Sequence, residues 1–169
     1  DSSVTGVQTC ALPILWLPLA RQGVARAQAS VALLYRNGQG VARDEGESIR
    51  WLRLAAEQGD AEAQTNLGMA LAQGLGTRPD AAEAVHWYRL AAAQNFAIAQ
   101  NALGSSYAAG HGVRQSFADA LNWFRLAAQQ GLAQAQFNLG AMYNYGQGVR
   151  QDYAEAFKWY RLAADQGLA

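Results

Sequence analysis

Lysine is almost absent from this sequence of 169 residues. Lys158 is the only lysine among 13 basic residues, and 13 acidic residues balance them to a formal net charge of zero. Proteins that hold nucleic acids or acidic membrane surfaces by bulk charge carry an excess of basic residues. No apolar run approaches the roughly 20 residues that a membrane-spanning helix needs. The composition therefore predicts neither a nucleic-acid partner nor membrane insertion.

Cysteine and histidine are also scarce. The single cysteine, Cys10, can form neither a disulfide framework nor a zinc cluster. The two histidines, His86 and His111, do not belong to a metal-ligand spacing such as His-Glu-x-x-His. Nucleophile motifs such as Ser-x-x-Lys and Gly-x-Ser-x-Gly are missing as well. We therefore expect no catalytic residue, no metal and no cofactor, and we do not expect an enzyme.

The N-terminal segment has an unusual sequence. Residues 4–14, VTGVQTCALPI, resemble the translation of a common sequencing-adapter oligonucleotide. This resemblance implies that residues 1–14 are not native and that Cys10 has no function. The alternative is a natural N-terminal tail. The apolar stretch at residues 11–20 is not typical of a signal sequence, because no basic segment precedes it.

A short glycine motif reveals an internal repeat. GQGV occurs at residues 38–41 and 146–149, GHGV at 110–113 and GLGT at 74–77, so the motifs are 36 residues apart. Each copy of the repeat opens with Ala-x-Ala-Gln and carries a tryptophan, with Arg-Leu-Ala-Ala beginning two residues after it. Three of the copies also contain Leu-Gly. The copies align without a gap over residues 25–60, 61–96, 97–132 and 133–168.

Each copy is predicted to form two helices. In the first, Ala27, Val31 and Tyr35 are spaced four residues apart and share one helical face. A glycine follows, as is common at helix ends. An N-cap residue with an acid three positions later then predicts the start of the second helix. These N-cap residues are Asp44, Asp80, Ser116 and Asp152. Because no strand-like alternation competes, the sequence predicts an all-α fold.

The Gly-x-Gly motif has a second possible interpretation, a phosphate-binding loop. Such loops place their glycines directly at a helix N-terminus after a strand. Here a helix precedes the motif, and the next helix begins only four residues after the second glycine. We therefore interpret the motif as a corner between two helices.

These motifs together resemble the Sel1-like repeats, relatives of the tetratricopeptide repeats, over residues 25–168. The period of 36 residues differs from the 34 residues usual in tetratricopeptide arrays. The resemblance implies an α/α superhelical solenoid of stacked helix-turn-helix repeats. It also implies a protein–protein interaction scaffold that binds a peptide or a partner protein on its concave face, in bacterial signalling, envelope or secretion assemblies. The second copy departs most, with Leu71, Thr77 and Asn95 in place of tyrosine, valine and glycine.

Two alternatives to a binding scaffold remain open at this point. The first is a structural spacer in a longer array, which holds flanking domains apart. The second, more remote, is an enzyme, because some small cysteine-rich relatives have been linked to β-lactam binding or hydrolysis. This chain lacks their cysteine pairs. The resemblance leaves the bacterial cytoplasm and the periplasm both open as the compartment.

Both ends of the repeat array resemble parts of further repeats. Residues 15–24 are interpreted as the remnant of a preceding repeat, because Gln22-Gly23 matches Gln58-Gly59. Pro18 weakens this match, since proline disrupts a helix interior. At the other end, residues 167–169 match the start of another repeat. We therefore expect an internal part of a longer array.

Two columns of polar residues each have two interpretations. The glutamines either tie one hairpin to its neighbour's backbone or form a polar ladder for the backbone of a ligand. The arginines either cover the tryptophans with their stems while their heads stay in water, or form a carboxylate-binding ladder. The columns are Gln28, Gln64, Gln100 and Gln136, and Arg53, Arg89, Arg125 and Arg161.

Partner binding is predicted at first-helix positions that differ between copies, because the identical residues build the stack. Apolar anchors separated by amides suit an extended peptide. Phe137 and Tyr145 are eight residues apart and align on one face. The alternative is that these two aromatic residues pack against a fifth repeat. The candidate residues are Leu33, Arg36, Asn66, Met69, Gln73, Asn101, Phe137, Asn138, Asn144 and Tyr145.

Overall fold

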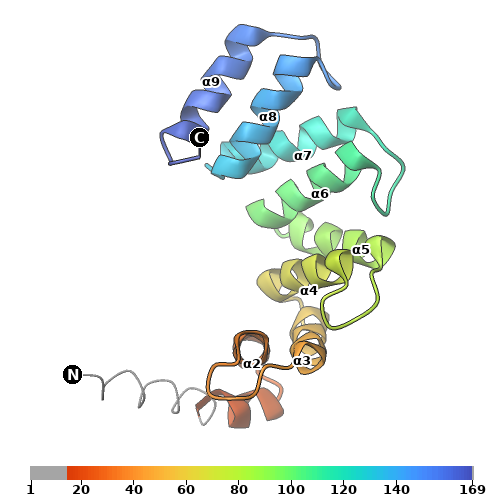
Figure 1. Ribbon diagram of the computed structural model, residues 1–169, viewed down its shortest axis with the longest axis vertical. Coiled ribbons are helices and arrows are strands. Elements are labelled where there is room, and N and C mark those ends of the chain that lie inside the picture. Colours follow the sequence, from red (N-terminus) through yellow and green to blue (C-terminus); the bar gives the residue numbers. More distant parts are fainter. Residues whose placement is uncertain (1–14, 169) are drawn as a thin grey trace, which may run out of the picture. The chain divides into compact units, whose positions relative to one another are not determined.

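The computed structural model describes residues 15–168, so the segment 1–14 with Cys10 lies outside the described residues. All secondary structure in residues 15–168 is helical, which confirms the predicted all-α class. Residues 15–21 form a helical segment. The helices that follow it (Figure 1) are α2 (Ala25–Asn37), α3 (Glu45–Glu57), α4 (Ala61–Gln73), α5 (Ala81–Ala93), α6 (Ala97–Ala109), α7 (Phe117–Gln129), α8 (Ala133–Tyr145) and α9 (Tyr153–Ala164).

The chain forms two compact units that divide between Trp87 and Tyr88, inside α5. In unit 1, α2 packs on α3, and α3 packs on α4. In unit 2, α6 packs on α7, α7 on α8, and α8 on α9. Each unit therefore contains helix-turn-helix repeats that stack on one another in chain order.

The second helix of each repeat begins where the N-cap residues predict. The cap of α3 is typical: the Asp44 carboxylate accepts a hydrogen bond from the Glu47 backbone N–H at 2.9 Å. The reciprocal bond of a capping box is replaced, because the Asp44 N–H donates to the Tyr35 carbonyl at 2.9 Å. The carboxylate three positions after the N-cap, Glu47 in α3, is therefore available to other partners. In α5, Glu83 accepts a hydrogen bond from the Trp87 indole at 3.2 Å.

Both glycines of the Gly-x-Gly motif have structural roles. The first ends a helix in the left-handed conformation, with φ of 66° at Gly38. The second brings the corner against the preceding repeat, because a Cβ on Gly76 would collide with the Glu45 carbonyl oxygen. A Cβ on Gly148 would collide in the same way with the Phe117 carbonyl oxygen. The motif is therefore the predicted corner, and it also forms a contact between repeats that the sequence pattern did not indicate.

The glycine of Leu-Gly makes space for an aromatic ring on the second helix. A Cβ on Gly104 would lie 2.7 Å from the Phe124 ring, and a Cβ on Gly140 would lie 2.9 Å from the Tyr160 ring. The first repeat has Ala32 at this position, and it has the smaller Leu52 where Phe124 and Tyr160 stand in later repeats. The size of the first-helix residue and the size of the second-helix residue are therefore matched.

Candidate functional site

The glutamine column ties each first helix to the helix before it, which confirms the first of the two interpretations. The side-chain amide of each glutamine donates to an alanine carbonyl eight residues earlier, and all four glutamines are buried. A second glutamine, which sequence reasoning missed, completes the arrangement: Gln58 donates to the Gln28 side-chain oxygen at 2.7 Å. The same bond recurs in unit 2 between Gln130 and Gln100 at 2.7 Å. The column is therefore engaged within the stack.

The arginine column also joins consecutive repeats. In unit 1, Arg53 donates to the Glu83 carboxylate at 2.6 Å, and this bond lowers the pKa of Glu83 below its ordinary value. In unit 2, Arg89 donates to the Tyr107 hydroxyl at 3.0 Å. One repeat later, Arg125 donates to the Tyr143 hydroxyl at 3.5 Å. Neither interpretation of this column included these contacts.

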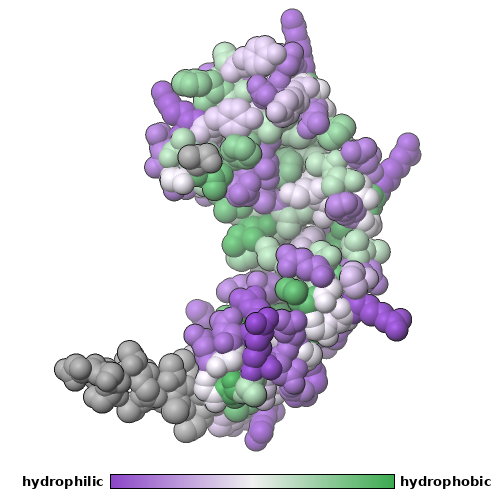
Figure 2. All heavy atoms as spheres, viewed as in Figure 1, coloured by the Kyte–Doolittle hydropathy of each residue, from purple (hydrophilic) through white to green (hydrophobic). Residues whose placement is uncertain are grey.

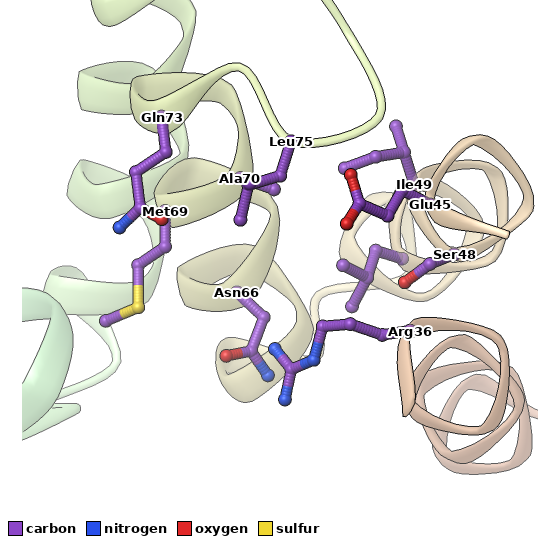
Figure 3. A pocket seen from close by; sticks show the side chains of 10 residues that line it. Arg36, Glu45, Ser48, Ile49, Asn66, Met69, Ala70, Gln73 and Leu75 are labelled. Atoms are coloured by element: carbon purple, nitrogen blue, oxygen red, sulfur yellow. The ribbon is translucent and has the colours of Figure 1, made fainter. Parts of the chain in front are cut away.

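Unit 1 contains a groove between its two repeats, here called groove 1 (Figure 3). Its volume is about 140 Å³. Apolar side chains lie beside polar ones in its lining, which combines the end of α2, the first turns of α3, one face of α4 and the corner after α4. The lining residues are Arg36, Glu45, Ser48, Ile49, Leu52, Asn66, Met69, Ala70, Gln73 and Leu75.

Unit 2 contains a groove at the same repeat positions, here called groove 2. Its volume is about 480 Å³, and none of its lining residues is charged. Asn138 stands where groove 1 has Asn66, and Ala108 stands where groove 1 has Arg36. The lining residues are Ser105, Ala108, Ala109, Gln115, Phe117, Phe124, Asn138, Ala141, Met142 and Gln147.

The predicted partner-binding residues fall partly on these grooves. Arg36, Asn66, Met69 and Gln73 line groove 1, and Asn138 lines groove 2. The structure thus brings four of the ten candidates together in unit 1.

The other candidates lie outside the two linings. Asn101 accepts a hydrogen bond from the Asn138 side chain at 2.9 Å, so part of the hydrogen-bonding capacity of both amides is already used. Phe137 packs on Tyr160 with ring centroids 5.3 Å apart, and Tyr145 is 69% exposed. The last two candidates, Leu33 and Asn144, are half-buried.

Sequence reasoning missed the contribution of the second helix to groove 1. The second-helix residues in the lining are Glu45, Ser48, Ile49 and Leu52. Ser48 is the most informative of them, because the other repeats have alanine at its position, as Ala84, Ala120 and Ala156. A polar residue in an alanine column was the signal that could have identified it. The prediction had considered variable positions on first helices only.

The surface of the molecule mixes polar and apolar residues, as Figure 2 shows for one face. Exposed leucines recur at one position of the second helix, as Leu54, Leu90, Leu126 and Leu162. Between residues 15 and 168, no helix has both the length and the apolar character needed to cross a membrane. The described part of the chain also holds no group of three or more His, Cys, Asp or Glu residues that could bind a metal ion.

Three solved structures with this arrangement of helices come from bacteria. The chain is 37% identical to a protective antigen present in uropathogenic Escherichia coli strains that displays an SLR fold, with a TM-score of 0.86 over 91% of this chain and 33% of that one. It is 33% identical to a Sel1 repeat protein from Oxalobacter formigenes, with a TM-score of 0.84 over 89% of this chain and 62% of that one. An immunity protein, Pa5087 from Pseudomonas aeruginosa, shares the fold at 19% identity and a TM-score of 0.53, over 93% of this chain and 74% of that one. A search of curated proteins gives no match.

The chain thus spans about a third of the first relative and less than two thirds of the second. These likenesses confirm the predicted fold class, an α-helical repeat solenoid. The Sel1 repeat family matches all four copies, at residues 25–60, 61–96, 97–132 and 133–168. Proteins with Sel1 repeats are generally protein-interaction scaffolds and typically have no enzymatic activity. With the repeats, the helical hairpins and the relatives in agreement, the chain belongs to the Sel1 repeat family.

Proposed function

We propose that this chain is a protein-binding scaffold that holds peptide segments of partner proteins, one in groove 1 and one in groove 2. The observation that supports this most strongly is the recurrence of a groove at the same repeat positions in both units. The residues that build the stack, such as the glutamines, are the same in the two units. The residues that line the grooves differ, as expected if they determine which ligand binds.

The chemistry of the linings supports a peptide ligand. Asn66 and Gln73 in groove 1 and Asn138 and Gln147 in groove 2 carry side-chain amides. An amide both donates and accepts hydrogen bonds, so it can pair with a peptide backbone. Apolar residues beside the amides, such as Met69, can contact the side chains of a ligand. The resemblance to known repeats implies that first helices line the concave side of the solenoid, and we assign ligand binding to that side.

The biological setting that we propose is the assembly of proteins in bacterial signalling, envelope or secretion systems. Its support is the family and the bacterial origin of the similar structures. The competing proposal is a structural spacer, which would need no ligand in either groove.

A peptide array tests the scaffold function. The probes are degenerate nonapeptides, N-acetylated and C-amidated, incubated with the complete chain. We expect the wild-type protein to bind a subset of spots and Met69→Glu to lose the binding that depends on groove 1. Gln73→Trp, at an exposed position of the same groove, provides a second blocking variant if Met69→Glu folds poorly.

Leu54→Glu is the matched control, because it changes an exposed apolar residue to glutamate outside groove 1. It should bind the same spots as the wild-type protein. Circular dichroism checks that every variant folds. A wild-type chain that binds no spot, or a Gln73→Trp variant that folds and binds as the wild type does, would contradict the proposal and favour a spacer.

A further inference from the structure

Groove 1 contains an arginine without a partner. Arg36 lies at the end of α2 and lines the groove, and its guanidinium forms no ion pair or hydrogen bond with any described residue. Three other arginines of unit 1 form ion pairs, since Arg43 contacts Glu45, Arg50 contacts Glu47 and Arg53 contacts Glu83. Arg36 is the only arginine in the lining of groove 1. Glu45 is the only acidic residue in the lining, and its partner is Arg43. Arg36 therefore presents an uncompensated positive charge to the groove.

A serine hydroxyl lies in the same groove. Ser48 is only 4% exposed, and no described residue forms a hydrogen bond with its side chain. Figure 3 shows this hydroxyl directed from α3 into the groove, while the Arg36 and Asn66 side chains enter from α2 and α4. Among the described residues the Trp51 indole nitrogen is the only fully buried side-chain polar atom without a partner, so the Ser48 oxygen itself reaches the space of the groove. Its hydroxyl is therefore a donor that an acceptor on a ligand can contact.

The two donors favour a negatively charged acceptor. A carboxylate accepts stronger hydrogen bonds than a neutral carbonyl, and the planar guanidinium of arginine matches its geometry. Ser48 supplies an additional O–H donor. Groove 2 has neither donor, since Ala108 and Ala120 stand at the positions of Arg36 and Ser48. The preference for negative charge should therefore be a property of groove 1 alone.

The remaining lining residues favour a carboxylate on a side chain within a peptide over one at its C-terminus. Asn66, Met69 and Gln73 follow one another along α4 and span roughly 10 Å, at about 1.5 Å per residue. That distance corresponds to about three residues of an extended chain. Amides at both ends of this row can pair with backbone on either side of the acidic residue, and Met69 between them can contact an apolar side chain.

We propose that groove 1 binds an internal acidic peptide segment, in which a Glu or Asp flanked by apolar residues places its carboxylate between Arg36 and Ser48. This assignment rests on the proposed scaffold function and identifies the chemical class of the partner. Arg36 and Ser48 are then the residues that determine specificity in unit 1.

The test compares peptides that differ only in charge. The probes are N-acetylated, C-amidated nonapeptides with Glu, Gln or Lys fixed at the central position and mixed residues elsewhere. A parallel set has Gln at the centre and a free C-terminal carboxylate. Affinities of the best Glu peptide and of its Gln counterpart are then measured by fluorescence anisotropy with the complete chain, at low and at high salt.

We expect the wild-type chain to bind the Glu peptide at least roughly ten-fold more tightly than the Gln peptide, as a charge-assisted hydrogen bond allows. Arg36→Ala should remove this preference and leave the affinity for the Gln peptide unchanged. Ser48→Ala should reduce the preference. Arg26→Ala removes an exposed arginine of the same helix that does not line the groove, so it should preserve the preference.

The outcomes distinguish this inference from the proposed function. Equal affinity for Glu and Gln peptides, or equal effects of Arg36→Ala and Arg26→Ala, would overturn the inference while leaving a peptide scaffold intact. Tight binding only to peptides with a free C-terminus would also overturn it. If no probe binds to the wild-type chain, both the inference and the scaffold function fail.

Discussion

Grooves 1 and 2 have the same framework and different surfaces. In both units, paired glutamines tie the repeats, and a corner glycine contacts the carbonyl at the start of the preceding second helix. In contrast, Arg36 and Ser48 line groove 1, and alanines stand at their positions in unit 2. The framework depends on backbone geometry and buried hydrogen bonds, which tolerate little change. The lining is free to vary, so it can specify different ligands on one scaffold.

The units also differ in how the two helices of a repeat fit together. Unit 2 pairs Gly104 with the aromatic Phe124, whereas the first repeat of unit 1 has Ala32 and Leu52 at these positions. In both pairs the larger residue lies on the second helix, and the first-helix residue is smaller where the second-helix residue is larger. Leu52 and Phe124 also line grooves 1 and 2, so substitutions of this pair can change both stability and the proposed ligand binding.

The largest effects are expected where the framework is shared. Gly76→Ala and Gly148→Ala place a Cβ against a backbone carbonyl at a positive φ, so each should lower the free energy of unfolding by about 2–5 kcal/mol. Urea denaturation measures the loss. Gly59→Ala and Gly131→Ala are the controls, because they have positive φ but no atom within 4 Å of the added Cβ. Equal losses in all four variants would contradict the contact between repeats.

An intermediate effect is expected from exchanging the helix pair between units. Gly104→Ala brings a Cβ within 2.7 Å of the Phe124 ring and should cost about 1–3 kcal/mol. Adding Phe124→Leu reproduces the Ala and Leu pair of the first repeat, and it should recover part of the loss. A double-mutant cycle by urea denaturation gives the coupling free energy. Simple additivity of the two changes would show that the two positions are not matched.

The sequence predicted the framework better than the site, for physical reasons. Glycine, N-cap residues and apolar spacing act within one helix or turn, so their roles at Gly38 and Asp44 could be derived locally. The contacts between repeats could not, because Gln58 and Gln28 are far apart in sequence. Leu71 stands where other copies have tyrosine, and the contact that replaces the tyrosine cannot be derived locally. Arg53 pairs with Glu83, whereas the unit 2 arginines contact tyrosines. Ser48 lies on a second helix, outside the first-helix positions at which the sequence pattern predicts partner binding.

The pairing of Arg53 with Glu83 predicts a small dependence of stability on acid pH in unit 1. In the folded state, Arg53 lowers the pKa of Glu83 below 4.5. The stabilisation that the pair provides is therefore complete above pH 4.5, and it is lost as the pH falls through the lowered pKa of Glu83. The pair is about a third exposed, so the effect should be no more than about 1 kcal/mol. Glu83→Gln should flatten the acid limb of stability against pH. Asp119→Asn, at the same repeat position in unit 2, should flatten it less, because the corresponding arginine, Arg89, contacts Tyr107 there.

The smallest effect concerns a hydrogen bond that one tryptophan lacks. Arg50 engages both carboxylate oxygens of Glu47, and the buried indole N–H of Trp51 has no partner among the described residues. In unit 2, Lys158 contacts a single oxygen of Glu155, and the Trp159 indole donates to the other at 3.1 Å. Arg50→Lys should therefore free one oxygen of Glu47 for Trp51.

The gain of about 1 kcal/mol from satisfying a buried donor is opposed by the loss of the Arg50 guanidinium, which lies 4.8 Å from the Trp51 ring. Stability should consequently change by less than about 1 kcal/mol, and hydrogen exchange of the indole N–H, followed by NMR, is the sharper measurement. We expect slower exchange at Trp51 in Arg50→Lys and faster exchange at Trp159 in Lys158→Arg. Unchanged exchange in both variants would show that the basic residue before the tryptophan does not control the indole bond, and that this difference between the units has another origin.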